Sequence, residues 1–129
     1  MQEISLYAKK NDDMEIFSDL AWLVSSELMA VGIDINFAPV LDVDENTSSI
    51  IGDRAFSNSV SEVIAYTSKY IDGMHDAGMK STGKHFPGHG GVYEDSHLHL
   101  PIDNRSKEDL ITSDTVSYTH LTLPTIYSV

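Results

Sequence analysis

The chain has 129 residues, and 41% of them are apolar, which is enough for one globular core. Its formal net charge of −12 argues against a nucleic-acid backbone or an anionic membrane surface as a partner, because both would be repelled. The absence of cysteine excludes disulfides, thiolate zinc sites and thiol nucleophiles.

The amino-terminal segment predicts a cytoplasmic protein. Residues 1–10 lack a basic start followed by an apolar stretch, so we expect no signal peptide. No apolar run approaches the roughly 20 residues needed to cross a bilayer. The partners expected are therefore neither nucleic acid nor membrane, and the sequence predicts no oligomeric state.

A helix followed by a strand is predicted first along the chain. Between residues 14 and 31, apolar residues recur every three or four positions, and Gly32 supplies the stop. Residues 33–40 then alternate as a strand until Pro39, which cannot donate to a strand ladder. The apolar helix positions are Phe17, Leu20, Val24, Leu28 and Val31.

After a polar loop to about residue 58, the helix and strand pattern repeats. Ser59 and Glu62 predict a capping box, and apolar residues at helical spacing continue to Gly78. Residues 79–86 predict a second strand, and Ser106 begins the first turn of a third helix after a long loop.

This alternation predicts an α/β fold with parallel strands. Two parallel strands cannot form a stable sheet alone, since such strands are normally buried on both faces. We therefore interpret residues 1–115 as part of a TIM-type (β/α)8 barrel of about 250 residues.

Residues 116–129 depart from this pattern. Apart from His120 they carry no side chain that could be charged, and Pro124 prevents a continuing helix. One interpretation is an edge strand. The segment also resembles the conceptual translation of a transposon-type sequencing adapter, so we interpret it as a non-native tail.

Chemistry-bearing residues gather where the second predicted strand ends. Lys84, His85 and His89 fall in a Gly/Pro-bounded run, and Asp95 and His97 follow shortly after. A single surface histidine is usually just solvated. However, the clustering of four of the six histidines between residues 85 and 99 favours a functional loop at the carboxyl end of a strand.

Four motifs in order resemble glycoside hydrolase family 3 β-N-acetylhexosaminidases, particularly the bacterial cytoplasmic enzymes of cell-wall recycling. The motifs are Asn36–Val43, Gly52–Phe56, Lys84–Gly90 and Asp95–His97, and the resemblance extends from about Asp12 to Asp114. It implies a TIM-type barrel that removes terminal β-linked N-acetylglucosamine from muropeptide fragments with retention of configuration, without a cofactor or a metal.

The resemblance also implies residue roles. His97 matches the family's acid/base and Asp95 the partner that orients it, whereas Arg54, Lys84 and His85 match substrate-binding positions. A histidine with a pKa near 6.5 can protonate a leaving oxygen and then activate water. The family's aspartate nucleophile falls beyond Asp114, so we expect this chain alone to be inactive.

Alternatives remain open. Asp95, His97 and His99 with His85 or His89 offer ligands for a metal, although no helical His-Glu-x-x-His motif is present. Residues 42–53 imitate a calcium loop but lack its glycine and glutamate. Arg54 could merely pair with Asp53 or Asp42. A family 3 β-glucosidase would not need the Asp95–His97 motif, and a non-catalytic sugar-binding module would tolerate its loss.

Overall fold

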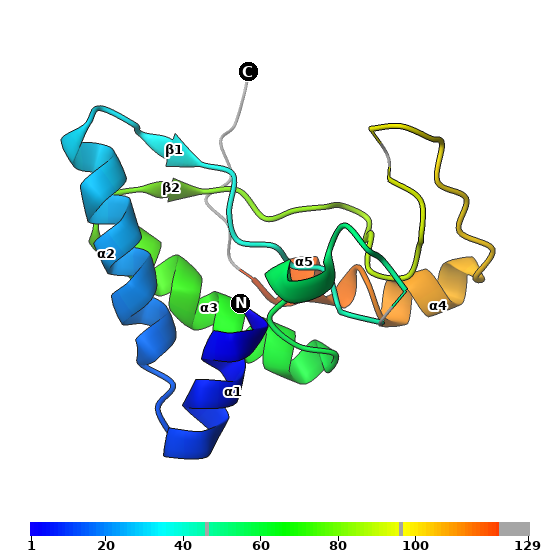
Figure 1. The fold of residues 1–129 in the computed structure, drawn as a ribbon, viewed down its shortest axis with the longest axis horizontal. Coiled ribbons are helices and arrows are strands. Elements are labelled where there is room, and N and C mark those ends of the chain that lie inside the picture. The colour runs from blue at the N-terminus through cyan, green and yellow to red at the C-terminus, as the bar shows by residue number, and fades with distance from the viewer. Residues whose placement is uncertain (46, 96, 122–129) are drawn as a thin grey trace.

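A parallel βαβ unit forms the centre of the structure, a computed structural model that describes residues 1–45, 47–95 and 97–121. In Figure 1, α2 and α3 lie side by side at one end of the molecule, and α4 lies at the other end. The elements in chain order are α1 (Gln2–Asn11), α2 (Ile16–Ala30), β1 (Ile35–Asn36), the 3-10 turn η1 (Gly52–Arg54), α3 (Val60–Asp76), β2 (Lys80–Ser81), α4 (Lys107–Thr112) and α5 (Val116–His120).

The parallel pairing predicted from the sequence is confirmed. β1 and β2 are hydrogen-bonded in parallel, with Ile35 opposite Lys80. The pairing continues past the regular strands to a parallel bridge between Val40 and Lys84. The Leu41 amide donates to the Lys84 carbonyl at 2.6 Å, so the two strand ends lie side by side.

The regular strands are shorter than the predicted ranges 33–40 and 79–86. Pro39 has no amide hydrogen, which interrupts the ladder before Val40. In the described part of the chain each strand also has only one neighbour, so neither is ordered from both sides.

The helices pack through an aromatic cluster. Phe17 of α2 stacks on Tyr66 of α3, with ring centroids 4.5 Å apart, and Phe56 lies 5.8 Å from Phe17. Ala8 of α1 completes this buried cluster. The predicted helices at 14–31 and 60–77 are confirmed as α2 and α3, whereas α1 was not predicted.

The predicted capping box at Ser59 and Glu62 is wrong. Ser59 is the N-cap residue of α3, but no side-chain hydrogen bond caps this helix. The Glu62 carboxylate instead pairs with Lys9 of α1 at 2.8 Å and accepts a hydrogen bond from the Ser57 hydroxyl. A tertiary ion pair has therefore replaced the local cap.

The third predicted helix is confirmed, and it begins with a complete capping box. The Ser106 hydroxyl accepts from the Asp109 amide at 3.1 Å, and the Asp109 carboxylate accepts from the Ser106 amide at 3.3 Å. Two of the otherwise unpaired amides at the start of α4 are satisfied in this way.

The segment from residue 116 is helical where the structure describes it, rather than an edge strand. α5 places Leu121 in the core, beside buried hydroxyls of Ser117 and Tyr118 that have no hydrogen-bond partner among the described residues. Each unpaired buried hydroxyl costs about 1–3 kcal/mol. Residues 122–129 of the predicted tail lie outside the described residues. In the ranges that the structure covers, no helix is long and apolar enough to cross a membrane.

We expect Gly73→Ala to destabilise the fold. Alanine normally stabilises a helix interior by about 1 kcal/mol relative to glycine. Here, however, an added Cβ would lie 2.1 Å from the backbone oxygen of Ser18, where α2 crosses α3. Urea unfolding of the full-length protein should show a lower free energy of unfolding. Ala65→Gly, at an exposed position of α3, gives the propensity effect alone, and a stabilised Gly73→Ala variant would contradict the close crossing.

The adapter interpretation of residues 116–129 predicts that the natural coding sequence diverges from this one near residue 115. Sequencing the locus from genomic DNA checks it. If the genome encodes residues 116–129 in continuous frame with the preceding residues, the tail is native and the interpretation is wrong.

Candidate active site

Asp42 lies at the centre of the polar cluster where the parallel strands end. Its side chain is fully buried, and both carboxylate oxygens accept hydrogen bonds from residues more than forty positions away. Oδ2 accepts from the His85 amide at 3.2 Å and from His85 Nδ1 at 2.7 Å. Oδ1 accepts from the His89 amide at 2.6 Å. The turn between the two histidines is therefore folded around one carboxylate.

This arrangement fixes the orientation of His85. Because a carboxylate can only accept, the proton of the neutral ring is assigned to Nδ1, which faces Asp42. Nε2 is left as the group that faces away from Asp42. The His85 side chain is 37% exposed, so its outer edge is open to a ligand.

His89 is a further member of the cluster that the sequence did not assign a role. Its ring packs edge-on against His85, with centroids 6.2 Å apart, and the residue is only 8% exposed. Within the described residues its Nε2 has no hydrogen-bond partner. A buried ring nitrogen without a partner is unusual, and the position of His89 beside His85 makes it part of the site.

Asp95 and His97 form the contact that the sequence predicts. Asp95 Oδ1 accepts from the His97 amide at 2.9 Å and from His97 Nδ1 at 2.7 Å. The hydrogen bond from the His97 backbone, followed by that from its imidazole, lowers the pKa of Asp95 below its ordinary value. The His97 side chain is 83% exposed, so Nε2 is accessible to solvent.

Arg54 and Lys84 line one cavity of about 320 Å³, beside the end of the β1 strand. The Arg54 guanidinium donates to the Ile50 carbonyl at 3.2 Å, and the ion pairs found among the described residues do not include it. Asp42 is engaged by the two histidines instead. The proposed salt bridge of Arg54 with Asp53 or Asp42 is thus not formed, and its charge remains available to a ligand.

The predicted site residues fall into three neighbouring groups. Arg54 and Lys84 share the cavity, His85 belongs to the Asp42 cluster, and Asp95 is paired with His97. His89 packs against His85 of the second group. No hydrogen bond of the described side chains joins His97 directly to Arg54, Lys84 or His85, the predicted substrate-binding residues.

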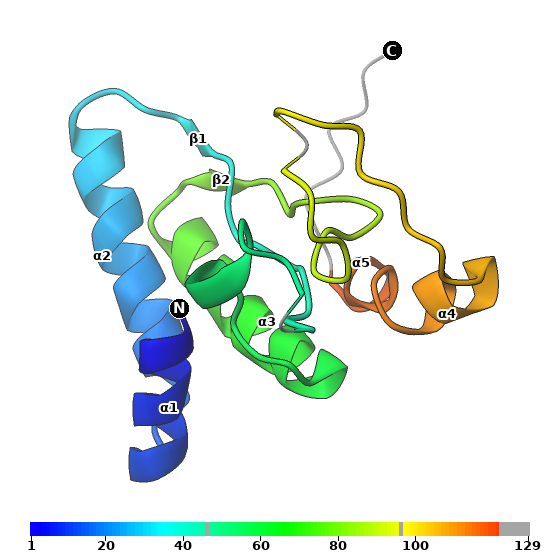
Figure 2. The same ribbon diagram turned by 45° about the vertical axis from the view of Figure 1, so that its right-hand side comes forward.

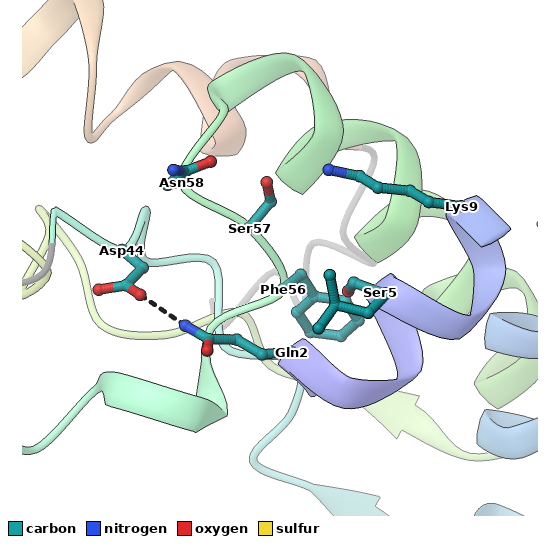
Figure 3. Close-up of a pocket in the computed structure, with 8 residues that line it drawn as sticks. Gln2, Ser5, Lys9, Asp44, Phe56, Ser57 and Asn58 are labelled. Atoms are coloured by element: carbon teal, nitrogen blue, oxygen red, sulfur yellow. Dashed lines mark hydrogen bonds between the residues drawn. The ribbon is translucent and has the colours of Figure 1, made fainter.

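A second cavity, of about 220 Å³, lies between α1 and the segment before α3, and Phe56 lines both cavities. Figure 3 shows its lining, with Gln2 donating to the Asp44 carboxylate at 2.5 Å. None of the predicted site residues lines it. Across the part of the chain that the structure describes, no three acidic or histidine side chains are arranged to hold a metal ion.

Comparison with known proteins identifies relatives of this chain. A family model described as the glycosyl hydrolase family 3 N-terminal domain matches residues 2–125 and so extends past residue 115. A beta-hexosaminidase of Tolumonas auensis is 50% identical over 116 residues, which cover 90% of this chain and 34% of the relative. One of Idiomarina loihiensis is 53% identical over 112 residues, covering 85% and 34%. The chain thus spans about a third of the length of the curated relatives it matches.

Solved structures show the same fold. NagZ from Neisseria gonorrhoeae, in complex with N-trifluoroacetyl-D-glucosamine, is 37% identical with a TM-score of 0.83, over 88% of this chain and 34% of that one. A family 3 beta-N-acetylglucosaminidase from a Paenibacillus species is 36% identical with a TM-score of 0.80, over 84% and 21%. The predicted fold class, part of a TIM-type barrel with parallel strands, is confirmed.

We expect Asp42→Asn to lower the free energy of unfolding by about 1–3 kcal/mol. Asparagine has one acceptor oxygen and one NH2 donor, so it cannot accept from the amides of His85 and His89 and from the imidazole together. Urea unfolding of the full-length protein measures the effect. Asp34→Asn, at an exposed position before β1, is the matched control. A difference between the two variants below about 0.5 kcal/mol, the usual range for surface changes, would contradict the central role of Asp42.

Proposed function

The chain belongs to glycosyl hydrolase family 3 as part of its N-terminal domain, and on that basis we propose that the full-length protein is a retaining β-N-acetylhexosaminidase with a His97–Asp95 acid/base pair. The observation that carries the proposal is the double hydrogen bond from His97 to Asp95 Oδ1. It holds an imidazole at a fixed angle while leaving the catalytic nitrogen exposed.

His97 Nε2 acts first as an acid and then as a base. In the first step it gives its proton to the glycosidic oxygen as the bond to the sugar breaks, and the carboxylate nucleophile bonds to the anomeric carbon to form the glycosyl intermediate. In the second step the neutral ring takes a proton from the water that attacks the glycosyl intermediate. Asp95 accepts from Nδ1 throughout and stabilises the imidazolium form. The depressed pKa of Asp95 keeps it as an acceptor during both steps.

The proposed sugar-binding groups stand apart from this pair. Lys84 and His85 lie at the end of the second parallel strand, and Arg54 lies in the η1 turn. Arg54 and Lys84 bring two cations to one cavity, and both are donors that suit sugar hydroxyl and carbonyl oxygens. His85 presents the ring edge opposite Asp42. The Neisseria relative was solved with N-trifluoroacetyl-D-glucosamine, which supports an N-acylglucosamine as the glycone here.

The finer parts of the proposal concern the rest of the protein. We place the aspartate nucleophile outside this chain and expect residues 1–129 by themselves to be inactive, because a retaining reaction needs a nucleophile. We also propose that the natural substrates are muropeptide fragments and that the enzyme acts in cell-wall recycling in a bacterial cytoplasm. The names of the relatives support the glycosidase activity, and the motif resemblance supports the substrate and location.

We predict that His97→Ala in the full-length protein lowers kcat for an unactivated N-acetylglucosaminide by about 10²–10⁴-fold, the usual contribution of a general acid/base. His99→Ala is the matched control, since His99 is exposed on the same loop and, among the described residues, its hydrogen bond runs from its backbone amide to the Asp95 carbonyl. Steady-state hydrolysis measures both variants. Unchanged turnover in His97→Ala would refute the acid/base assignment.

The same assay separates the alternatives. A family 3 β-glucosidase would prefer an aryl β-glucoside over the aryl N-acetylglucosaminide, whereas a sugar-binding module would bind N-acetylglucosamine without hydrolysing either glycoside. The proposal requires hydrolysis with preference for the N-acetylglucosaminide.

A further inference from the structure

Arg105 lies at the base of the loop that carries Asp95 and His97, and it contacts three carboxylates. Its Nε donates to both oxygens of Asp103, at 3.1 and 3.0 Å, and one terminal nitrogen donates to Asp103 at 2.6 Å. The guanidinium also donates to Glu45 at 2.5 Å and contacts the two oxygens of Asp114 at 3.0 and 3.3 Å. These bonds connect the segment after β1, the end of the loop and the segment after α4.

The start of the same loop packs against this group without room for a side chain. A Cβ added to Gly91 would lie 2.4 Å from a terminal nitrogen of Arg105, and one added to Gly88 would lie 2.3 Å from Asp114. The two ends of the loop 92–104 therefore meet at one guanidinium. Figure 2 shows this loop in yellow, between the segment that follows β2 and α4.

The rest of the loop has few other attachments. Tyr93, Leu98 and Leu100 are 70%, 74% and 85% exposed. The hydrogen bonds of the described residues in the segment 92–102 stay within it, as in those from the Leu98 and His99 amides to the Asp95 carbonyl. Its internal shape is local, whereas its position relative to the strand ends is set at its base.

Arginine is suited to this place. Its planar fork serves several carboxylates at once, which a lysine ammonium cannot do with the same geometry. Its side chain is 23% exposed and that of Asp114 only 2%, so removing the guanidinium would leave a buried carboxylate unpaired. Hydrogen bonds from Arg105 lower the pKa of Asp103, and hydrogen bonds to Asp103 and Asp114 raise the pKa of Arg105.

We propose that Arg105 is a positioning residue that sets the place of the His97–Asp95 pair against the bound sugar by closing the base of its loop. This inference rests on the proposed function. Among the described residues, the hydrogen bonds and ion pairs of Arg105 do not include Asp95 or His97, and the groups proposed to hold the sugar lie on other segments. Loss of Arg105 therefore affects proton transfer more than sugar binding.

The test uses kcat/KM of the full-length protein for a series of aryl N-acetylglucosaminides whose leaving groups differ in pKa. A good leaving group departs without protonation, so a displaced acid slows only the substrates with poor leaving groups. We expect Arg105→Ala to lower kcat/KM by about 10- to 100-fold for the poorest leaving group, within the range of general acid catalysis. For the best leaving group it should stay within about threefold of the wild-type value.

Further variants keep the test decisive if Arg105→Ala does not fold. Arg105→Lys should give a smaller change of the same kind, and Gly91→Ala should reproduce it by displacing the guanidinium. Lys69→Ala is the matched control, because it removes a surface ion pair between α3 and Glu15 at the start of α2. The dependence of its kcat/KM on leaving-group pKa should equal that of the wild type.

The outcomes separate the two proposals. A wild-type protein that hydrolyses none of the glycosides refutes the proposed function, and with it this inference. An active wild type whose Arg105 and Gly91 variants slow all leaving groups equally, or none, refutes only the positioning role. A steeper dependence on leaving-group pKa in these variants, absent from Lys69→Ala, supports it.

Discussion

The buried carboxylate of Asp42 is the constraint on which the site depends. A carboxylate removed from water is tolerated only when hydrogen bonds satisfy its oxygens, and the only donors that reach it belong to the His85–His89 turn among the described residues. Parallel pairing of the two strands brings these groups together, because it places Asp42 directly beside the end of the neighbouring strand. The need to satisfy Asp42 therefore determines both the path of the turn and the orientation of the His85 ring.

Two further sets of contacts connect the Asp42 cluster to the loop that carries Asp95 and His97. The turn ends at glycines that pack directly on Arg105 and Asp114, so the loop starts from a fixed point. Arg105, at the returning end of the loop, contacts that same point through Gly91 and Asp114. Between these ends, the Asp95–His97 pair keeps its own geometry through hydrogen bonds across two residues. The Asp95–His97 pair forms without a distant partner. Its position relative to the strand ends, however, depends on the contacts at the base of the loop.

Sequence reasoning succeeded where the causes are local. The apolar period of α2 and α3, and the pairing of Asp95 with His97 two positions away, depend on neighbours along the chain, and both were predicted. It failed for side chains whose hydrogen-bond or ion-pair partner lies far away along the chain. Glu62 left its expected capping role because Lys9 reaches it from α1. The α1 helix itself was not predicted, and it owes its place to the aromatic cluster that Ala8 joins.

The site residues that the sequence did not reveal, Asp42 and Arg105, also depend on partners that are distant along the chain. Asp42 lies within the Asn36–Val43 motif, but the roles considered for it were a partner for Arg54 and part of a calcium-like loop, since its true partners are over forty residues away. A polar residue directly after a predicted strand, with another strand end rich in histidine, was the available signal. Arg105 offered no such signal, because a lone arginine in a polar loop is usually solvated.

The groups proposed to bind the sugar and the group proposed to transfer the proton are held in place in different ways. Of the groups proposed to hold the sugar, Lys84 and His85 lie at a strand end, where the backbone pairing and a buried carboxylate allow little movement, and Arg54 belongs to the η1 turn. The proposed proton-transfer group, His97, would serve two steps, donating to one oxygen and then accepting from another. It stands on a loop whose hydrogen bonds to other segments, among the described residues, lie at its base. The proposed mechanism needs fixed binding groups and an acid/base on a separately anchored loop. The sugar must stay in place while His97 first protonates the leaving oxygen and then takes a proton from water. Arg105, at the base of that loop, is the residue proposed to set the position of His97 relative to the bound sugar.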